Sequence, residues 1–173
     1  ISARGNILWI DDEIEHLKPH ILFLEEKGYK ITQARNGYDA LELSMVNAYD
    51  LILLDQSMPG MDGIEILTKL KEQNKSYVVI MITKTEDEWL MNEAITEQVE
   101  QFLTKPVNPS QIFMACKQVL EKNKIRQDSD TSKYLSEFQN IELNLGNKKT
   151  VDDWYGLYNK LLDWQIRFDS HRN

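Results

Sequence analysis

Short apolar runs alternate with amphipathic stretches over the first two thirds of the chain, and this alternation constrains the fold more than any other feature. The apolar runs predict strands at residues 7–10, 30–34, 51–54, 78–82 and 101–104. The amphipathic stretches predict helices that end near 26, cover about 38–46, 63–73 and 86–96, and begin near 109. Strands that are apolar throughout are buried on both faces, which is typical of a parallel sheet covered by helices on each side.

Five strand-helix units predict an α/β fold with a flavodoxin-like, doubly wound parallel sheet in the order 2-1-3-4-5. In that order the winding of the chain switches between strands 1 and 3, and ligands bind at the carboxyl ends of these two strands. We therefore expect the functional residues there. Proline inside a helix is costly, so Pro19 predicts that the first helix starts or restarts at about Lys18.

The pattern becomes purely helical after about residue 122, which predicts an all-α segment. Apolar residues recur there at helical spacing: Tyr134, Leu135 and Phe138, then Trp154, Leu157, Tyr158, Leu161, Leu162 and Trp164. Residues 146–147 predict a turn, and residues 150–153 a helix start. We expect one domain at 5–122 and part of a helical bundle at 123–173. The last helix of the first domain would run on into the second, and a further C-terminal domain would follow.

Charge and composition exclude several classes of function. The formal net charge is −8, with 13 basic against 20 acidic residues up to Lys124, which disfavours direct binding of nucleic acid. The apolar runs are far shorter than the roughly 20 residues of a membrane span, so we expect no membrane association. The single cysteine, Cys116, excludes an internal disulfide and fits a cytoplasmic protein. Residues 1–4 suggest a processed N-terminus and no signal peptide.

Three carboxylates close predicted strands. Asp11 and Asp12 follow the first strand and Asp55 ends the third, so the predicted fold gathers them at one edge of the sheet. Mg²⁺ would neutralise such a cluster, because it accepts one or two carboxylates, a backbone carbonyl and several waters. The alternative is that Asp12 caps the following helix, with Glu15 completing a capping box.

Five short motifs follow one another in a characteristic order. They are residues 9–13 (Trp-Ile-Asp-Asp-Glu), 54–55 (Leu-Asp), 58–63 (Met-Pro-Gly-Met-Asp-Gly), Thr83 and 105–106 (Lys-Pro). The successive separations are 43 residues from Asp12 to Asp55, 28 from Asp55 to Thr83 and 22 from Thr83 to Lys105. In these motifs, and over about residues 5–122, the chain resembles the receiver domains of bacterial two-component response regulators.

The resemblance implies that a sensor histidine kinase transfers a phosphoryl group to Asp55. Such a transfer relies on positioning and on neutralisation of charge. Lys105, before a cis peptide bond to Pro106, would pair with a phosphoryl oxygen, Thr83 would donate its hydroxyl to another, and Phe102 would be a switch aromatic that turns inward. The implied Mg²⁺ ligands are Asp11, Asp12, Asp55 and the backbone carbonyl of Ser57.

The chain departs from the usual receiver pattern in two places. Lys84 follows Thr83 where a small residue is typical, and Gln-Val at 98–99 replaces the common Gly-Ala. Lys84 would crowd the mouth of the pocket or add a second cation. Together with Ser57 and Thr85, which would lie near the path of the attacking water, it is expected to set the phosphoryl lifetime.

A receiver followed by a helical bundle resembles the PorX-type regulators of the type IX secretion system, in which a PglZ domain of the alkaline-phosphatase superfamily follows. The resemblance implies a fragment that is no enzyme beyond its own phosphorylation and dephosphorylation, with a downstream protein partner such as a sigma factor. Phosphorylation would reshape the fourth helix, fifth strand and fifth helix into a homodimer surface. Residues expected on that surface are Trp89, Leu90, Met91 and Phe113.

Other interpretations stay open or are disfavoured. The main alternative is a phosphorelay or adaptor receiver that docks a partner through its helical tail. A haloacid-dehalogenase-type phosphatase is disfavoured because Ser57 stands where such enzymes carry a second Asp. His16 and His20 are expected on a solvated helix face rather than in a metal site. The four tryptophans are expected in the core, although Trp89 could mark a docking face.

Overall fold

The computed structural model describes residues 4–84, 97–145 and 151–172. The elements are β1 (Gly5–Ile10), a 3-10 turn η1 (Ile14–Leu17), α1 (Lys18–Glu26), β2 (Tyr29–Ala34), α2 (Gly37–Val46), β3 (Leu51–Asp55), α3 (Gly63–Gln73), β4 (Val79–Thr83), β5 (Gln101–Thr104), α5 (Pro109–Leu145) and α6 (Val151–Arg172). By their contacts, residues Ile1–Leu120 and Glu121–Asn173 form two compact units.

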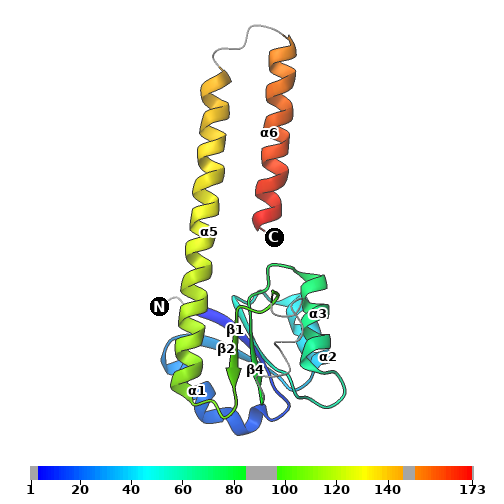
Figure 1. The fold of residues 1–173 in the computed structure, drawn as a ribbon, viewed down its shortest axis with the longest axis vertical. Helices are drawn as coiled ribbons and strands as arrows, with labels where there is room; N and C mark the ends of the chain where they lie inside the picture. The colour runs from blue at the N-terminus through cyan, green and yellow to red at the C-terminus, as the bar shows by residue number, and fades with distance from the viewer. Residues whose placement is uncertain (1–3, 85–96, 146–150, 173) are drawn as a thin grey trace. The chain divides into compact units, whose positions relative to one another are not determined.

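The first unit is a parallel five-stranded sheet in the order β2-β1-β3-β4-β5, which confirms the predicted fold (Figure 1). The register aligns the carboxyl ends of neighbouring strands. Ile10 pairs with Leu54, Asp55 with Ile82, and Thr83 with Thr104. Residues that close β1, β3 and β4 therefore meet at one edge of the sheet.

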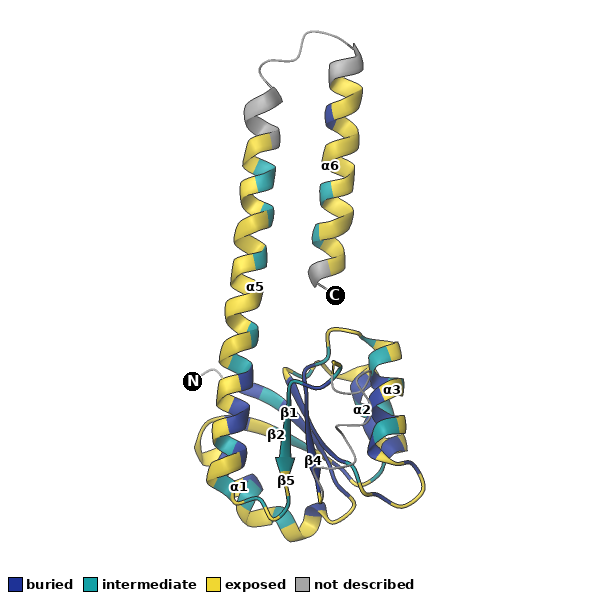
Figure 2. Cartoon of the chain, in the orientation of Figure 1, coloured by how far each residue is buried: buried dark blue, intermediate teal, exposed yellow. Residues whose placement is uncertain are grey.

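Two hydrophobic clusters lie on opposite faces of the sheet. One joins β-strand side chains to α1 and to the start of α5, for example Trp9, Leu24 and Cys116. The other joins them to α2 and α3, for example Leu54 and Ile66. All residues of β3 and β4 are buried, as expected for strands covered on both sides, and the helices expose their outer faces (Figure 2).

The first helix begins where the sequence predicts. α1 starts at Lys18 with Pro19 in its first turn, and the 3-10 turn η1 precedes it. Neither element has a side-chain cap, so the capping alternative for Asp12 is wrong. Glu15 pairs instead with Arg35 beyond β2. The helix predicted at 86–96 lies outside the described residues.

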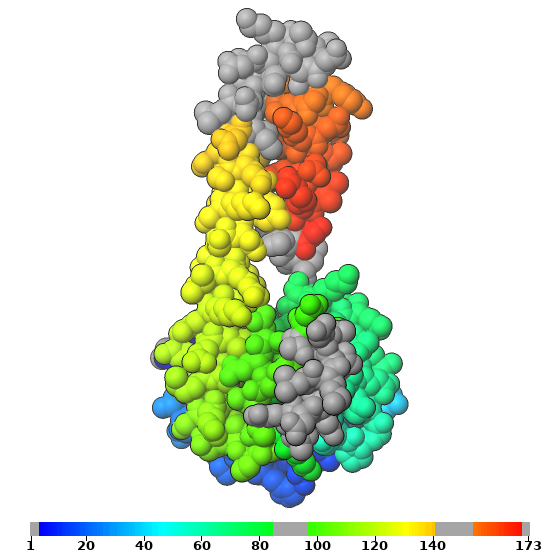
Figure 3. All heavy atoms as spheres, viewed as in Figure 1, coloured from blue at the N-terminus to red at the C-terminus, as the bar shows by residue number. Residues whose placement is uncertain are grey.

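The second unit is a helix pair. α5 continues without a break past residue 120, as predicted, and α6 starts at Val151; the turn predicted at 146–147 lies outside the described residues. The helices are antiparallel, because Tyr134 contacts Phe168 while Phe138 contacts Trp164. In Figure 3 the described parts of the two helices, yellow for α5 and orange to red for α6, lie side by side. The indole N–H of Trp164 also donates to the Tyr134 carbonyl at 2.8 Å.

Much of the predicted apolar stripe on this pair is exposed. Leu157 is buried, but side chains along α6 remain exposed, including Trp154, Tyr155, Tyr158, Leu161, Leu162 and Ile166. The expectation that all four tryptophans are core residues is therefore wrong for Trp154, and Trp89 lies outside the described residues. Among the described residues, no helix is long and apolar enough to cross a bilayer.

Candidate functional site

Three carboxylates meet at the sheet edge, where the sequence predicts them. Oxygen atoms of Asp11, Asp12 and Asp55 all lie within 4.8 Å of one another. Asp11 is 1% exposed and Asp55 2%, whereas Asp12 faces solvent. Two of the three charges are thus held where water cannot hydrate them, and an arrangement of this kind needs compensating cations.

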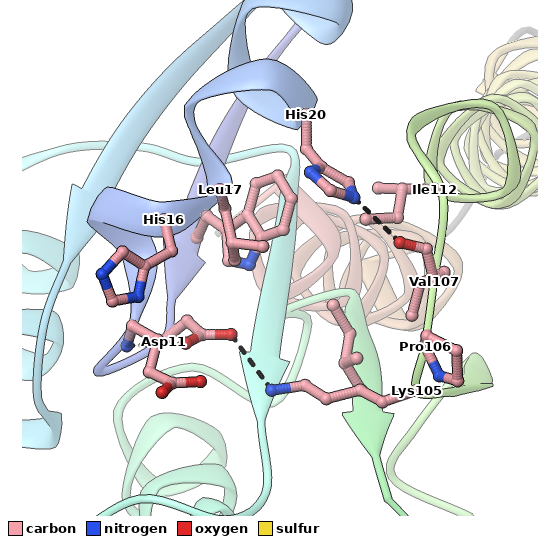
Figure 4. Close-up of a pocket in the computed structure, with 11 residues that line it drawn as sticks. Asp11, His16, Leu17, His20, Lys105, Pro106, Val107 and Ile112 are labelled. Carbon is pink, nitrogen blue, oxygen red and sulfur yellow. Dashed lines mark hydrogen bonds and ion pairs between the residues drawn. The ribbon is translucent and has the colours of Figure 1, made fainter.

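Lys105 supplies one of these cations. Its Nζ lies 3.0 Å from Asp55 Oδ2 and 3.4 Å from Asp11 Oδ2, and Figure 4 shows the ammonium group directed at Asp11. Burial lowers the pKa of Lys105, but its hydrogen bond to Asp55 and the charges of both carboxylates outweigh burial and raise the pKa above its ordinary value. The peptide bond to Pro106 is cis, as expected.

Backbone amides position the two buried carboxylates. Glu13 N donates to Asp11 Oδ1 at 2.8 Å, and Ser57 N donates to Asp55 Oδ1 at 3.3 Å. Burial raises the pKa of Asp11, although the Glu13 amide and the Lys105 charge act in the opposite direction. Each carboxylate therefore has one oxygen held by backbone and one directed at Lys105.

The loop after β3 is shaped by two glycines and a helix cap. Gly60 has a φ of +89°, a conformation that L side chains rarely adopt. A Cβ on Gly63 would lie 2.6 Å from the Asp55 carbonyl oxygen, so only glycine lets α3 start this close to the phosphoacceptor candidate. Asp62 caps α3 by accepting from Glu65 N at 2.8 Å.

Thr83 ends β4 and is 1% exposed. Its hydroxyl donates to Gln56 Oε1 at 2.7 Å, a contact that the sequence patterns did not predict. Lys84, next along the chain, is exposed, and Thr85 lies outside the described residues. Phe102 on β5 is partly buried against the cluster that includes α2 and α3.

A recess of about 390 Å³ borders Asp11 and Lys105 between α1 and the loop after β5. His20 lines it, and its Nε2 lies 2.8 Å from the Val107 carbonyl, as Figure 4 shows. Its ring also meets Trp9 edge-to-face. The expectation of a solvated His20 is therefore wrong, because the side chain joins α1 to the segment that carries Lys105; His16 is exposed as expected.

The predicted dimer residue Phe113 also has an internal role. Its ring packs against Phe23 of α1 and Tyr29 of β2, with centroids 6.1 and 6.3 Å away. It is partly buried against the core. Phe113 therefore packs internally, and its part in a surface for a second copy stays a prediction; Trp89, Leu90 and Met91 lie outside the described residues.

The donor set fits a small hard cation. Three carboxylates and one ammonium leave an excess of two negative charges, and oxygen ligands suit Mg²⁺. Asp12 is open to solvent, so a cation there could keep several of its waters, as Mg²⁺ prefers. A cation held there could neutralise the charge of a phosphoryl group that arrives beside a buried carboxylate.

Comparison with known proteins identifies two segments. A family model described as the response regulator receiver domain matches residues 7–117. A second, described as the PorX response regulator linker domain, matches residues 124–173.

Similar proteins include the transcriptional regulatory protein SrrA of Staphylococcus aureus, which is 32% identical over 152 residues. The alignment covers 86% of this chain and 63% of SrrA, so the chain spans less than two thirds of that relative. Among solved structures, a Clostridium thermocellum receiver domain protein is 27% identical with a TM-score of 0.62, over 70% of this chain and 98% of that one. Thermotoga maritima TrrA, in complex with Mg²⁺ and BeF, is 27% identical with a TM-score of 0.59, over 66% and 97% of the two chains.

Proposed function

Because the chain belongs to the response regulator receiver family of two-component systems, we propose that Asp55 accepts a phosphoryl group from a sensor histidine kinase. The observation that carries the proposal is the 3.0 Å contact between Lys105 and a carboxylate that is 2% exposed and lies among two others. In the transfer, the P–N bond of a phosphohistidine breaks as a bond forms between phosphorus and an Asp55 oxygen.

Each neighbouring group has a proposed part in this step. Lys105 would keep the Asp55 carboxylate oriented and then pair with a phosphoryl oxygen, and Thr83 would donate its hydroxyl to another. Asp11, Asp12, Asp55 and the Ser57 carbonyl would hold Mg²⁺, which supplies charge neutralisation when bound. The similar protein TrrA was solved in complex with Mg²⁺ and BeF, which supports a Mg²⁺ site in this chain by similarity.

Two further roles rest on the sequence resemblance. Phe102 would be the switch aromatic of β5, and it is partly buried, so a rotation could change its exposure. Ser57 and Lys84 are both exposed, so each could reach a water that attacks the aspartyl phosphate. With Thr85 they would set the rate of dephosphorylation.

Acetyl phosphate provides the direct test of Asp55. The full chain is incubated with acetyl phosphate and Mg²⁺, and its intact mass is measured. We expect a gain of one phosphoryl group that is absent in Asp55→Asn and in EDTA. Asp128→Asn, an equivalent change at an exposed position of α5, is the matched control and should be modified as wild type. Modification that persists in Asp55→Asn would refute the assignment.

For the output, we propose a PorX-type regulator with a receiver at 5–122 and a helical segment at 123–173. The linker-domain match over 124–173 supports this organisation. Phosphorylation would change the surface around β5 and α5 and promote a homodimer, with a protein partner such as a sigma factor and a role in type IX secretion. The chain would act in the cytoplasm. Light scattering with and without beryllofluoride tests the dimer, and an unchanged mass would contradict it.

The phosphorelay or adaptor interpretation is favoured by one observation, the exposed aromatic residues of α6. Trp154, Tyr155 and Tyr158 are each at least half exposed, which suits a surface for a partner protein. A relay receiver would pass its phosphoryl group to a second histidine protein. Loss of the phosphoryl group to water alone would favour the regulator.

A further inference from the structure

We infer that Gln56 is a positioning residue that holds the Thr83 hydroxyl in the unmodified receiver and must release it when Asp55 is phosphorylated. This inference rests on the proposed function and concerns a residue outside the predicted site. Gln56 directly follows Asp55, is half-buried, and its Oε1 accepts from Thr83 Oγ1 at 2.7 Å.

The backbone at both ends of this contact is fixed. Gln56 N donates to the Ile82 carbonyl at 3.0 Å, and Gln56 O accepts from Gly63 N at 2.9 Å. The Thr83 carbonyl accepts from Lys105 N at 2.6 Å. Because these bonds hold the main chain at both residues, rotation of the side chains is the simplest way for the Gln56–Thr83 contact to break.

The chemistry of a hydroxyl makes the contact exclusive. Threonine has one hydroxyl proton to donate, and here it is directed to the Gln56 amide oxygen. A phosphoryl group on Asp55 brings several acceptor oxygens that need donors. Thr83 cannot donate to a phosphoryl oxygen and to Gln56 at once, so engagement of the phosphoryl group requires that this bond break.

The expected change in affinity for a phosphoryl mimic follows from the strength of the Thr83–Gln56 hydrogen bond that must break. A neutral hydrogen bond contributes a net stabilisation that corresponds to about a threefold to tenfold change in an equilibrium constant. Gln56 should therefore weaken binding of a phosphoryl mimic by about that factor. Replacing it with a side chain of similar length but no strong acceptor should strengthen binding equally.

Beryllofluoride with Mg²⁺ is the probe, and its affinity is measured by ¹⁹F NMR titration of the full chain. We expect Gln56→Met to bind it about threefold to tenfold more tightly than wild type. Gln56→Leu, which also lacks the acceptor, should act in the same direction. Gln118→Met, the same replacement at an exposed position of α5, should leave the affinity unchanged.

A double-mutant cycle separates this role from a general structural one. In a Thr83→Val background the hydroxyl is absent, so adding Gln56→Met should no longer change the affinity. Equal affinities of wild type and Gln56→Met, or the same gain in both backgrounds, would overturn the inference alone. A wild-type chain that binds no beryllofluoride would overturn the proposed function and this inference with it.

Discussion

Replacing Lys105 with methionine removes the ammonium group between two buried carboxylates. Nζ lies 3.0 Å from Asp55 Oδ2 and 3.4 Å from Asp11 Oδ2, and each contact contributes about 5 kcal/mol of Coulomb energy at an effective dielectric constant of about 20. Desolvation of the three groups offsets much of that sum, and removing one partner of a buried pair lowers stability by about 3–5 kcal/mol. The Lys105 side chain is 24% exposed. We therefore expect a loss of about 2–3 kcal/mol in the free energy of unfolding.

Mg²⁺ should compensate for the missing charge. In EDTA, Lys105→Met should melt roughly 10 °C below wild type, since about 1 kcal/mol corresponds to a few degrees in a unit of this size. In saturating Mg²⁺ the difference should shrink by more than half, because a divalent cation neutralises the same carboxylates. Thermal unfolding followed by circular dichroism measures both differences.

A surface lysine provides the matched control. Lys69 pairs with Glu65 at 3.7 Å on the exposed side of α3, and such a pair contributes about 0.3–0.5 kcal/mol. Lys69→Met should therefore change the melting temperature little, and equally with and without Mg²⁺. If Lys105→Met were as stable as wild type in EDTA, or if its deficit did not respond to Mg²⁺, the account of the charge cluster would be wrong.

Three further predictions concern packing and burial in the first unit. Gly63→Ala would place a Cβ 2.6 Å from backbone atoms at the end of β3, so urea unfolding should show a loss of about 1–3 kcal/mol, whereas Gly156→Ala, in open space on α6, should be neutral or stabilising. His20→Leu leaves the Val107 carbonyl without its 2.8 Å partner and should lower the free energy of unfolding by about 1–2 kcal/mol in the same assay. Burial raises the pKa of the Cys116 thiol to about 12, so at pH 9 it stays protonated in the folded state and Ellman's reagent should react only as fast as the protein unfolds. Rapid labelling of the native protein would contradict that account.

The strands and their order could be predicted because burial on two faces leaves a strong local pattern. Leu51–Asp55 and Val79–Thr83 are buried along their whole length, and the apolar runs at 51–54 and 78–82 indicate them to within one residue. The limits of β1 were less clear, since Gly5 and Asn6 pair with β2 through backbone atoms and need no apolar side chain. The start of α1 was predictable because Pro19 restricts where a helix can begin.

Contacts between distant side chains could not be predicted in the same way. His20 and Val107 are 87 residues apart, and Thr83 and Gln56 are 27 residues apart; neither pair has a periodic signal. Both contacts depend on which distant segments the fold brings together. The position of Gln56 directly after Asp55 was the one available indication, and a polar residue there is compatible with many roles.

If Asp55 is phosphorylated as proposed, the charges of the cluster explain why the Thr83 hydroxyl would exchange the Gln56 amide oxygen for a phosphoryl oxygen. Three carboxylates and Lys105 sum to −2, so one Mg²⁺ neutralises them. A phosphoryl group then replaces the single charge of Asp55 with about −1.5 to −2, which leaves an excess of negative charge in a buried site. A hydrogen bond to a charged acceptor is roughly twice as strong as a neutral one. Exchange of the Gln56 amide for a phosphoryl oxygen is therefore favourable by only about 1 kcal/mol. Phosphorylation would thus shift the population of Thr83 rotamers by a free energy of this size.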